Sequence, residues 1–264
     1  MKAIRSSIRG TVTAALLLAL VGGQLPLAQS AEEANLDKRT VQLLQETCDY
    51  LTGATSFTLR ARIAFDEILP TGQKLQFHGI ADIAVRRPDR LRVDYQGDRR
   101  HSTLWYDGKT LTLMDREKNL YATSAAPATI DAALDFAMER YGFTVPVADL
   151  VYDDPCSGLT RDAESMFTVG SSILDGRKMH HIAATQENID WQAWIEDGRQ
   201  LVPRKMLITY KDEPGAPQYS AVLTDWDFSP RLPDRLFTFE APEGALLIDF
   251  RQAGQLPSES AEKE

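Results

Sequence analysis

The spacing of apolar positions predicts a helix near the N-terminus, followed by a long succession of strands. Between residues 36 and 52 apolar side chains recur every three or four positions, which is the period of an amphipathic helix. Asn35 or Asp37 can cap this helix, and Gly53 ends it. From residue 57 to residue 66 apolar and polar side chains alternate strictly, which predicts a strand with one buried face.

Similar alternation recurs through most of the remaining chain and predicts an antiparallel meander. Three Asp-Gly pairs, which tight hairpin turns favour, lie between runs of β-forming residues. Gly79 interrupts one of these runs, so we expect a bulge or a bend in the sheet there. The predicted strands cover residues 57–66, 75–85, 91–95, 104–106, 111–113, 166–171, 177–185, 190–196, 203–211, 218–228 and 236–240.

The middle of the chain departs from this alternation. A helical stripe predicts a helix over residues 129–141 with Thr129 as its N-cap, and residues 147–152 predict a second, short helix. Because both helices interrupt the meander, we expect them to cover one face of the sheet. The pattern therefore predicts a chain that is mainly β with some α, and an antiparallel rather than a parallel sheet.

Residues 1–30 have the three-part pattern of a bacterial secretory signal. A basic start precedes an apolar run of about ten residues, and small residues precede a cleavage site after Ser30 or Ala31. A membrane-spanning helix is the alternative, but it needs about twenty apolar residues. No cysteine lies at the cleavage zone, so we expect a mature periplasmic protein without a lipid anchor.

Composition and charge bound the remaining chain. A hydrophobic fraction of 43% in 264 residues supports one folded domain, which we place at residues 31–250, and the polar residues 251–264 predict a disordered acidic tail. The formal net charge is −9, and it becomes −12 once the three basic residues of the signal are removed. An acidic chain without a basic cluster argues against nucleic acid and against anionic membranes as partners.

Arginines are densest around the predicted turn after the second strand. Arg86, Arg87, Arg90 and Arg92 occur there with several aspartates close by in the sequence. We interpret this stretch as a solvated strand face on which the aspartates balance the arginines. A site for an anion is the alternative.

The chain has two cysteines, Cys48 and Cys156. In an oxidising compartment they can form a disulfide. Cys48 also falls on the apolar stripe of the first predicted helix, where a cysteine can serve simply as a small buried side chain. The sequence leaves both interpretations open, because the bond requires a geometry that spacing does not reveal.

Residues that would support catalysis or metal binding are sparse. His180 and His181 are adjacent in a predicted strand, so they point to opposite faces and cannot jointly bind one metal ion. The sequence contains no zinc-protease motif, no nucleophile elbow and no glycine-rich phosphate loop. We therefore expect no catalytic residues, no metal and no cofactor.

The apolar faces of the predicted strands suggest how the protein functions. One N-terminal helix and two short helices offer less apolar surface than a sheet of this length needs for cover. We expect the excess to form a cavity, a groove or a surface for a partner.

The order of these elements resembles that of the LolA/LolB-type periplasmic lipoprotein carriers. The chain is more similar to an uncharacterised family of predicted periplasmic proteins within that superfamily. The resemblance covers nearly the whole mature chain, although each motif is short. It rests on residues 87–92 (RPDRLR), 106–109 (YDGK), 146–150 (PVADL), 181–183 (HIA), 190–195 (DWQAWI), 203–205 (PRK) and 237–245 (FTFEAPEGA).

This resemblance implies an unclosed antiparallel β-barrel, or half-barrel, of roughly ten strands. A helical lid inserted mid-chain would lie over an apolar concave face that takes acyl chains. Arg87 matches the arginine that ties the lid shut in the carriers. We expect the ligand to contact Leu59, Ile63, Phe65, Phe77, Ile83 and Val93 on the wall and Leu134, Met138 and Tyr141 under the lid.

The leading hypothesis is a monomeric, non-enzymatic periplasmic carrier of a lipid, a lipidated partner or another hydrophobic ligand. The alternative is a sensor or interaction module that binds an envelope polypeptide, as does a periplasmic regulator of a stress-response anti-sigma factor with the same superfamily shape. An enzyme acting on envelope lipids or glycans is a third hypothesis. It would require His181 to lie beside two buried carboxylates.

Overall fold

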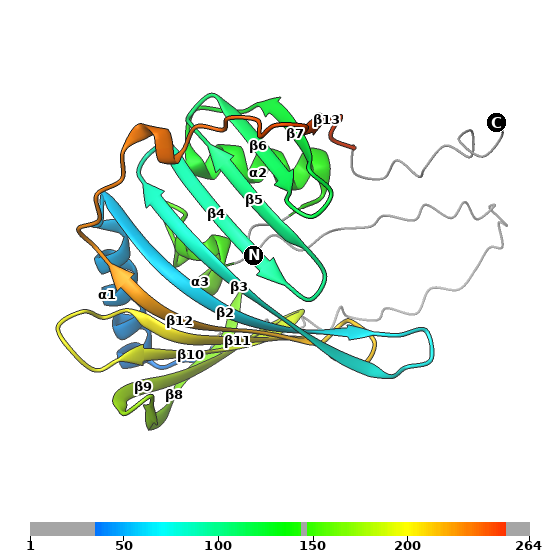
Figure 1. Cartoon of the computed structure of the whole chain (residues 1–264). Coiled ribbons are helices and arrows are strands. Elements are labelled where there is room, and N and C mark those ends of the chain that lie inside the picture. The colour runs from blue at the N-terminus through cyan, green and yellow to red at the C-terminus, as the bar shows by residue number, and fades with distance from the viewer. Residues whose placement is uncertain (1–34, 144–146, 252–264) are drawn as a thin grey trace, which may run out of the picture.

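The computed structural model describes residues 35–143 and 147–251. In these residues the chain forms one strongly curved sheet of 13 strands with its α-helices on the concave side (Figure 1). The predicted secretory signal lies outside the described residues, as does all of the predicted tail except Arg251. No helix within the described ranges has the length and the apolar character that a bilayer span requires.

Two antiparallel meanders build the sheet, and they join where β12 pairs with β2. The strand order is β1-β8-β9-β10-β11-β12-β2-β3-β4-β5-β6-β7-β13, so the described sheet is open at both edges. The first meander consists of β2 (Ser56–Ile68), β3 (Lys74–Arg86), β4 (Arg90–Gly97), β5 (His101–Tyr106), β6 (Thr110–Asp115) and β7 (Leu120–Ala125). The second consists of β8 (Ala163–Leu174), β9 (Arg177–Gln186), β10 (Ile189–Glu196), β11 (Pro203–Tyr210) and β12 (Gln218–Asp227).

The two long helices have N-caps that the sequence predicts, whereas the predicted helix over residues 147–152 is only a short 3₁₀ turn at Ala148–Leu150 and the helix Ser157–Thr160 was not predicted. The Asp37 carboxylate accepts the Thr40 backbone N–H at 3.0 Å, and the Thr129 hydroxyl accepts the Ala132 N–H at 3.3 Å. Gly142 ends the second long helix in the left-handed conformation, with a φ of 69°. The helical elements are α1 (Lys38–Thr52), α2 (Ile130–Tyr141), α3 (Ser157–Thr160) and the 3₁₀ helices η1 (Ala148–Leu150) and η2 (Asp234–Leu236).

The sheet has more strands than the roughly ten predicted, and one predicted strand is wrong. Two-residue strands, β1 (Asn35–Leu36) and β13 (Leu246–Leu247), form the two edges of the sheet and pair in parallel with β8 and β7. The sequence pattern missed β1 and β13 because strands of two residues are too short to show alternation. It also missed the longer strand β7.

Residues 236–240 do not form the predicted strand. Phe237 is fully buried, and the Phe239 ring lies 5.0 Å from that of Trp105 and 4.8 Å from that of Tyr121, centroid to centroid. Alternate apolar residues here anchor a segment that crosses the outer face of the sheet (Figure 1). The spacing reflects this packing and not a ladder of backbone hydrogen bonds.

Gly79 marks a close packing contact and not a bulge. It pairs in regular register with Ile63 on β2 and with Gly97 on β4. A Cβ atom at Gly79 would lie 2.3 Å from the Tyr95 hydroxyl oxygen, and one at Gly97 would lie 2.6 Å from it. Both glycines therefore leave room for the Tyr95 ring to lie flat against the sheet.

Candidate functional site

The predicted wall residues share one face of neighbouring strands. Leu59 pairs with Ile83 and Ile83 with Val93, so their side chains lie side by side across β2, β3 and β4. Phe65 and Phe77 are also paired, and their ring centroids are 5.8 Å apart. Because strand side chains alternate between faces, the register that aligns these pairs creates a continuous apolar concave surface.

Most of this surface is covered by the chain itself. Leu59, Ile63, Ile83 and Val93 are only 2–3% exposed, and Leu134 of α2 is 5% exposed. All five belong to one apolar core that also contains residues of α1, β10, β11 and β12. The expectation that the wall exceeds its cover fails at these positions, because the sheet curls until its two meanders and α1 share one interior (Figure 1).

The remaining predicted contacts, Phe65, Phe77, Met138 and Tyr141, are partly exposed. Phe65 and Phe77 lie near the β2–β3 turn, and we call this end of the strands the hairpin end of the sheet. Helix α2 crosses the strands near their other end: its first residue, Ile130, donates its N–H to Pro88, and its last, Tyr141, bonds Ser124, which lies in the same row of paired residues as Val85. The structure therefore does not bring Tyr141 to the same end of the strands as Phe65 and Phe77.

Helix α2, η1, α3 and the described residues between them (130–143 and 147–160) lie across the concave face, and we call them the cover segment. Arg87, at the end of β3, holds its middle. The guanidinium donates to the Val151 carbonyl at 2.5 Å, to the Tyr152 carbonyl at 3.1 Å and to the Asp153 carboxylate at 3.3 Å. The Arg87 side chain is only 9% exposed and lies over the Phe57 ring. Burial lowers the pKa of Arg87, while Asp153 and Asp131 oppose that shift.

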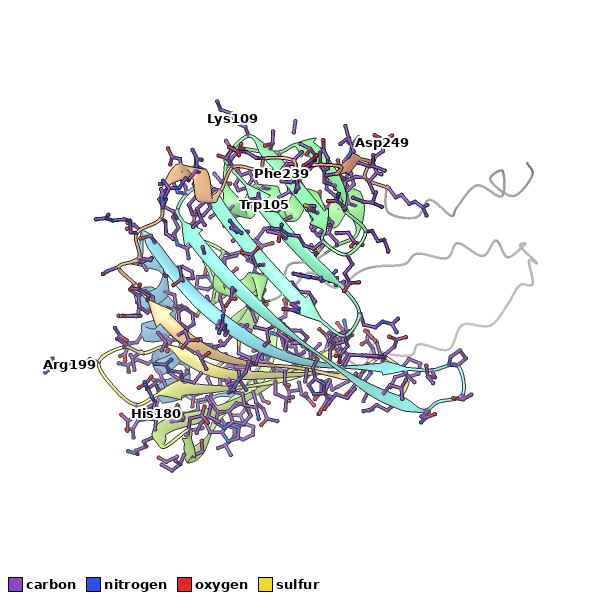
Figure 2. The ribbon with its side chains drawn as sticks, in the orientation of Figure 1. Trp105, Lys109, His180, Arg199, Phe239 and Asp249 are labelled. Carbon is purple, nitrogen blue, oxygen red and sulfur yellow. A yellow bond between two sulfur atoms is a disulfide. The ribbon has the colours of Figure 1, made fainter. Side chains whose placement is uncertain are left out.

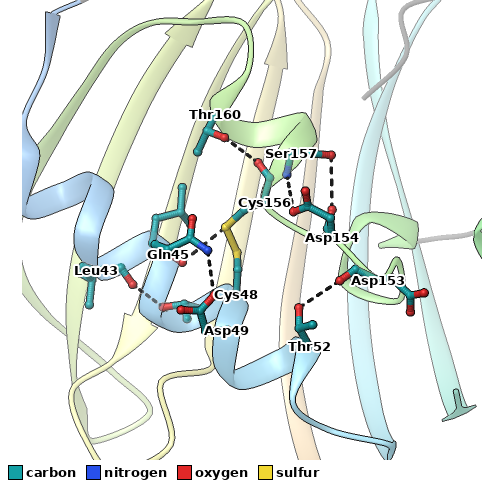
Figure 3. The surroundings of a disulfide bond; sticks show 12 residues. Leu43, Gln45, Cys48, Asp49, Thr52, Asp153, Asp154, Cys156, Ser157 and Thr160 are labelled. Atoms are coloured by element: carbon teal, nitrogen blue, oxygen red, sulfur yellow. Dashed lines mark hydrogen bonds between the residues drawn. A yellow bond between two sulfur atoms is a disulfide. The ribbon is translucent and has the colours of Figure 1, made fainter. Parts of the chain in front are cut away.

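A disulfide joins the cover segment to α1. Cys48 and Cys156 are bonded across a sequence separation of 108 residues, with their Cα atoms 5.8 Å apart (Figure 3). Both cysteines are buried, and beside them the Thr52 hydroxyl donates to the Asp153 carbonyl at 3.1 Å. The bridge and Arg87 thus hold the same short stretch of the cover segment from two sides.

Carboxylates connect the parts of the cover segment to one another. Asp131 of α2 accepts the Asp153 backbone N–H with both oxygens, at 3.1 and 3.2 Å. The Tyr152 hydroxyl donates to Asp135 at 3.1 Å. Burial raises the pKa of Asp131, and burial also raises the pKa of Asp149 in η1. These acids were not among the predicted site residues, because nothing local in the sequence shows that they become buried.

Asp149 should make the fold less stable as the pH rises. Its folded-state pKa is raised, so its contribution favours folding when the carboxyl is protonated and is lost as the pH rises through the folded-state pKa. We expect Asp149→Asn to raise the melting temperature at pH 7, with the advantage over wild type narrowing toward pH 4. Thermal unfolding by circular dichroism measures this, with the exposed Asp212→Asn as control. A difference in melting temperature between Asp149→Asn and wild type that stays constant with pH would contradict the raised pKa of Asp149.

Tyr141 is held by the edge of the sheet and by the C-terminal segment. Its hydroxyl donates to Ser124 of β7 at 2.8 Å, and its ring stacks on that of Phe250 at a centroid distance of 4.5 Å. Phe250 also stacks on Phe143 at 6.0 Å. The sequence did not single out Phe250, since its partners lie more than a hundred residues earlier.

The histidines have ordinary structural partners. His181 lies 2.9 Å from the Gln192 side-chain oxygen and stacks on Trp194 at 4.2 Å, whereas His180 lies 3.4 Å from Asp197. These contacts do not provide the two buried carboxylates that an enzyme hypothesis required of His181. Among the described residues, no group of three or more potential metal ligands comes together.

Comparison with known proteins places the chain in a family. Residues 40–251 match the model of the family described as "Predicted periplasmic protein (DUF2092)". The chain belongs to this family. The match confirms the expected membership of a family of predicted periplasmic proteins. No curated protein matches the sequence.

Several solved structures align with this chain at low sequence identity. An uncharacterized conserved protein from Thermus thermophilus is 11% identical, with a TM-score of 0.45 over 78% of this chain and 98% of that one. The lipoprotein LppX of Mycobacterium tuberculosis is 12% identical, with a TM-score of 0.43 over 75% and 100%. A LolA superfamily protein from Nitrosomonas europaea is 11% identical, with a TM-score of 0.35 over 76% and 97%.

Proposed function

We propose that this protein is a non-enzymatic periplasmic carrier that binds a lipid, a lipidated partner or another hydrophobic ligand between the concave wall and the cover segment. The supporting observation is the way in which the cover segment is attached. Strands of the sheet are held by ladders of backbone hydrogen bonds, whereas α2 lies on the wall through side chains and a few polar contacts. Such a layer can separate from the sheet without breaking the sheet.

The attachments of the cover segment indicate which end opens. The stretch around Val151–Cys156 is held by Arg87 and by the disulfide, while the far end of α2 is held by the Tyr141–Ser124 hydrogen bond and the Phe250 ring. We propose that α2 lifts at its C-terminal end, and that the partly exposed Phe65 and Phe77 at the hairpin end form the first apolar surface that a ligand meets.

Burial of an acyl chain can offset the cost of this opening. Exposing Ile130 and Leu134, the two large buried side chains of α2, costs about 1.5–3 kcal/mol each. Each methylene taken from water contributes about 0.8 kcal/mol, so ten of them contribute about 8 kcal/mol. A long chain therefore stabilises the opened state, and a short one does not. We infer that the ligand carries a long apolar chain.

A series of saturated fatty acids tests this proposal. We expect affinity, measured by displacement of a fluorescent fatty acid, to rise roughly fourfold for each added methylene until the concave surface is filled. Native mass spectrometry of protein purified from its own periplasm should show a bound lipid. Affinities that do not depend on chain length, together with protein that never carries lipid, would refute the proposal.

Two neighbouring positions on β3 provide a matched pair of variants. Phe77→Gln places a polar group on the concave face and should weaken binding about fivefold to tenfold, because Phe77 is only partly buried. His78→Gln changes the next residue, which is exposed on the opposite face, and should leave affinity unchanged. Equal effects of the two substitutions would place the ligand elsewhere.

A specific feature of β8 favours polypeptide binding as a second candidate function. In the described residues β1 pairs only with Ser165 and Met166, which leaves the rest of that edge without a strand partner. Phe167 and Val169 are each 51% exposed there, and Ile173 is 71% exposed. An open apolar edge can accept an extended segment as an added strand. Capture of an envelope polypeptide by protein without extractable lipid, lost in Ile173→Lys, would favour this function.

A further inference from the structure

The outer face of the sheet carries a second structural feature, separate from the concave wall. Leu104 of β5 pairs with Val93 on the concave face, and strand side chains alternate, so the next residue, Trp105, points to the outer face. Trp105 is nevertheless buried. Phe239, from the segment that crosses this face, packs on Trp105 (Figure 2). The crossing segment and the sheet together enclose space on the side of the protein opposite the proposed carrier site.

Two hollows lie under and beside this segment, and their charges differ. The first, of about 250 Å³, contains Arg60 and Arg92, but each of these is paired with an aspartate of the same hollow, Asp82 or Asp94. The second, of about 310 Å³, is lined by three arginines and one acid, Glu240. Only the second hollow therefore offers positive charge in excess.

The three arginines of the second hollow are not equivalent. Arg92 is committed to Asp94 through two bonds of 2.8 and 3.2 Å and to the Leu236 carbonyl at 3.3 Å. Among the described residues the Arg116 side chain donates through Nε alone, to the Thr103 hydroxyl at 2.9 Å, and its guanidinium lies over the Trp105 ring at 5.2 Å. This bond fixes the position of the Arg116 guanidinium while its other nitrogens keep no ion pair within the described residues.

Arg235 lies on the crossing segment and supplies the second available guanidinium. Within the described part of the chain it makes no ion pair, whereas the adjacent Asp234 pairs with Arg86. Guanidinium groups bind phosphate and carboxylate oxygens with paired, charge-assisted hydrogen bonds. Phe239 and Trp105 add aromatic surface beside the two arginines.

We propose that this hollow binds a small soluble organic anion, in which a phosphate or carboxylate group contacts Arg116 and Arg235 and an attached aromatic or apolar group lies against Phe239. The volume of about 310 Å³ is at the small end of ligand pockets, and it suits a molecule of this kind rather than a long chain. This site does not depend on the proposed carrier function, because it lies on the other face of the sheet.

Calorimetric titration of the full chain tests the site with phenyl phosphate, inorganic phosphate and neutral benzyl alcohol. We expect saturable binding of phenyl phosphate, weaker binding of inorganic phosphate, and none of benzyl alcohol. Arg235→Gln should weaken phenyl phosphate binding about tenfold, as expected for loss of a charge-assisted hydrogen bond. Arg199→Gln, in an exposed arginine far from Trp105 and Phe239, should bind as wild type does (Figure 2).

Three outcomes would overturn the proposal. The first is that phenyl phosphate shows no saturable binding, and the second is that Arg235→Gln and Arg199→Gln change its affinity equally. The third is that the protein binds none of these small molecules and associates only with vesicles of phosphatidylcholine and phosphatidylglycerol. Arg235 is exposed, so its substitution should leave the circular dichroism spectrum and melting temperature unchanged. Because the fatty-acid series reports on the concave face, failure of either site would be distinguishable from failure of the other.

Discussion

Removing the disulfide by Cys48→Ala with Cys156→Ala should lower the free energy of unfolding by about 4–5 kcal/mol, since the bond closes a loop of about a hundred residues in the unfolded chain. For a protein of this size, that loss corresponds to a fall of roughly 10 °C or more in melting temperature. Denaturant titration of the oxidised and reduced wild-type protein measures the same quantity without substitution.

The single variants provide the control for this prediction. Each of Cys48→Ala and Cys156→Ala already abolishes the bond, so the double variant should be little worse than either single one. Simple loss of packing at two buried positions would instead give effects that add. Identical unfolding of oxidised and reduced protein would show that the bond does not constrain the chain.

Arg87→Ala should have the second largest effect, a loss of about 3 kcal/mol in the free energy of unfolding, because it removes a buried charged donor and leaves the carbonyls of Val151 and Tyr152 without their partner. The loss should be concentrated in the cover segment. Hydrogen exchange should therefore accelerate at the described residues 147–160 far more than in β2 or β3.

Two further arginine variants define the role of Arg87. Arg87→Lys keeps the charge but lacks the fork that reaches two carbonyls and Asp153, so it should recover only part of the lost stability. Arg60→Ala removes an exposed ion pair with Asp82 that solvent screens, so it should cost far less stability than Arg87→Ala does. An Arg87→Ala protein as stable as Arg60→Ala would exclude Arg87 as an anchor of the cover segment.

Arg87→Ala also connects the stability of the fold to the proposed function. If the cover segment must lift for a ligand to reach the wall, weakening its anchor should speed both uptake and release of a fluorescent fatty acid. The disulfide should remain intact in Arg87→Ala, so the two anchors can be weakened separately. If the rates of uptake and release were unchanged both in Arg87→Ala and in the variant without the disulfide, the ligand would not pass beneath this part of the chain.

Local signals in the sequence predicted most of the elements of the fold. The alternation from residue 57 to residue 66 corresponds to β2, and the helical stripes correspond to α1 and α2 with their caps Asp37 and Thr129. These features depend on neighbours within a few residues. The alternation also determined which side chains of each strand share a face, and so grouped Leu59, Ile83 and Val93 correctly.

Contacts between distant segments were beyond the reach of these signals. The pairing of β12 with β2 joins the two meanders, and it lets the sheet curl until the predicted wall is covered by the chain's own side chains. The sequence pattern counted helices as the only cover and did not include the opposite half of the sheet. It therefore predicted an excess of apolar surface that is absent at Leu59, Ile63, Ile83, Val93 and Leu134.

The sequence by itself determined most of the strands, the two long helices, the faces of the strands and the family of this protein, because periodicity and short motifs can be read from residues that are close in the sequence. Only the tertiary structure decided that Cys48 meets Cys156, that Arg87 reaches the carbonyls of Val151 and Tyr152, and that Phe250 lies on Tyr141. Each of these contacts joins residues more than sixty positions apart. Their approach depends on how a thirteen-stranded sheet curves, and no local pattern encodes that curvature.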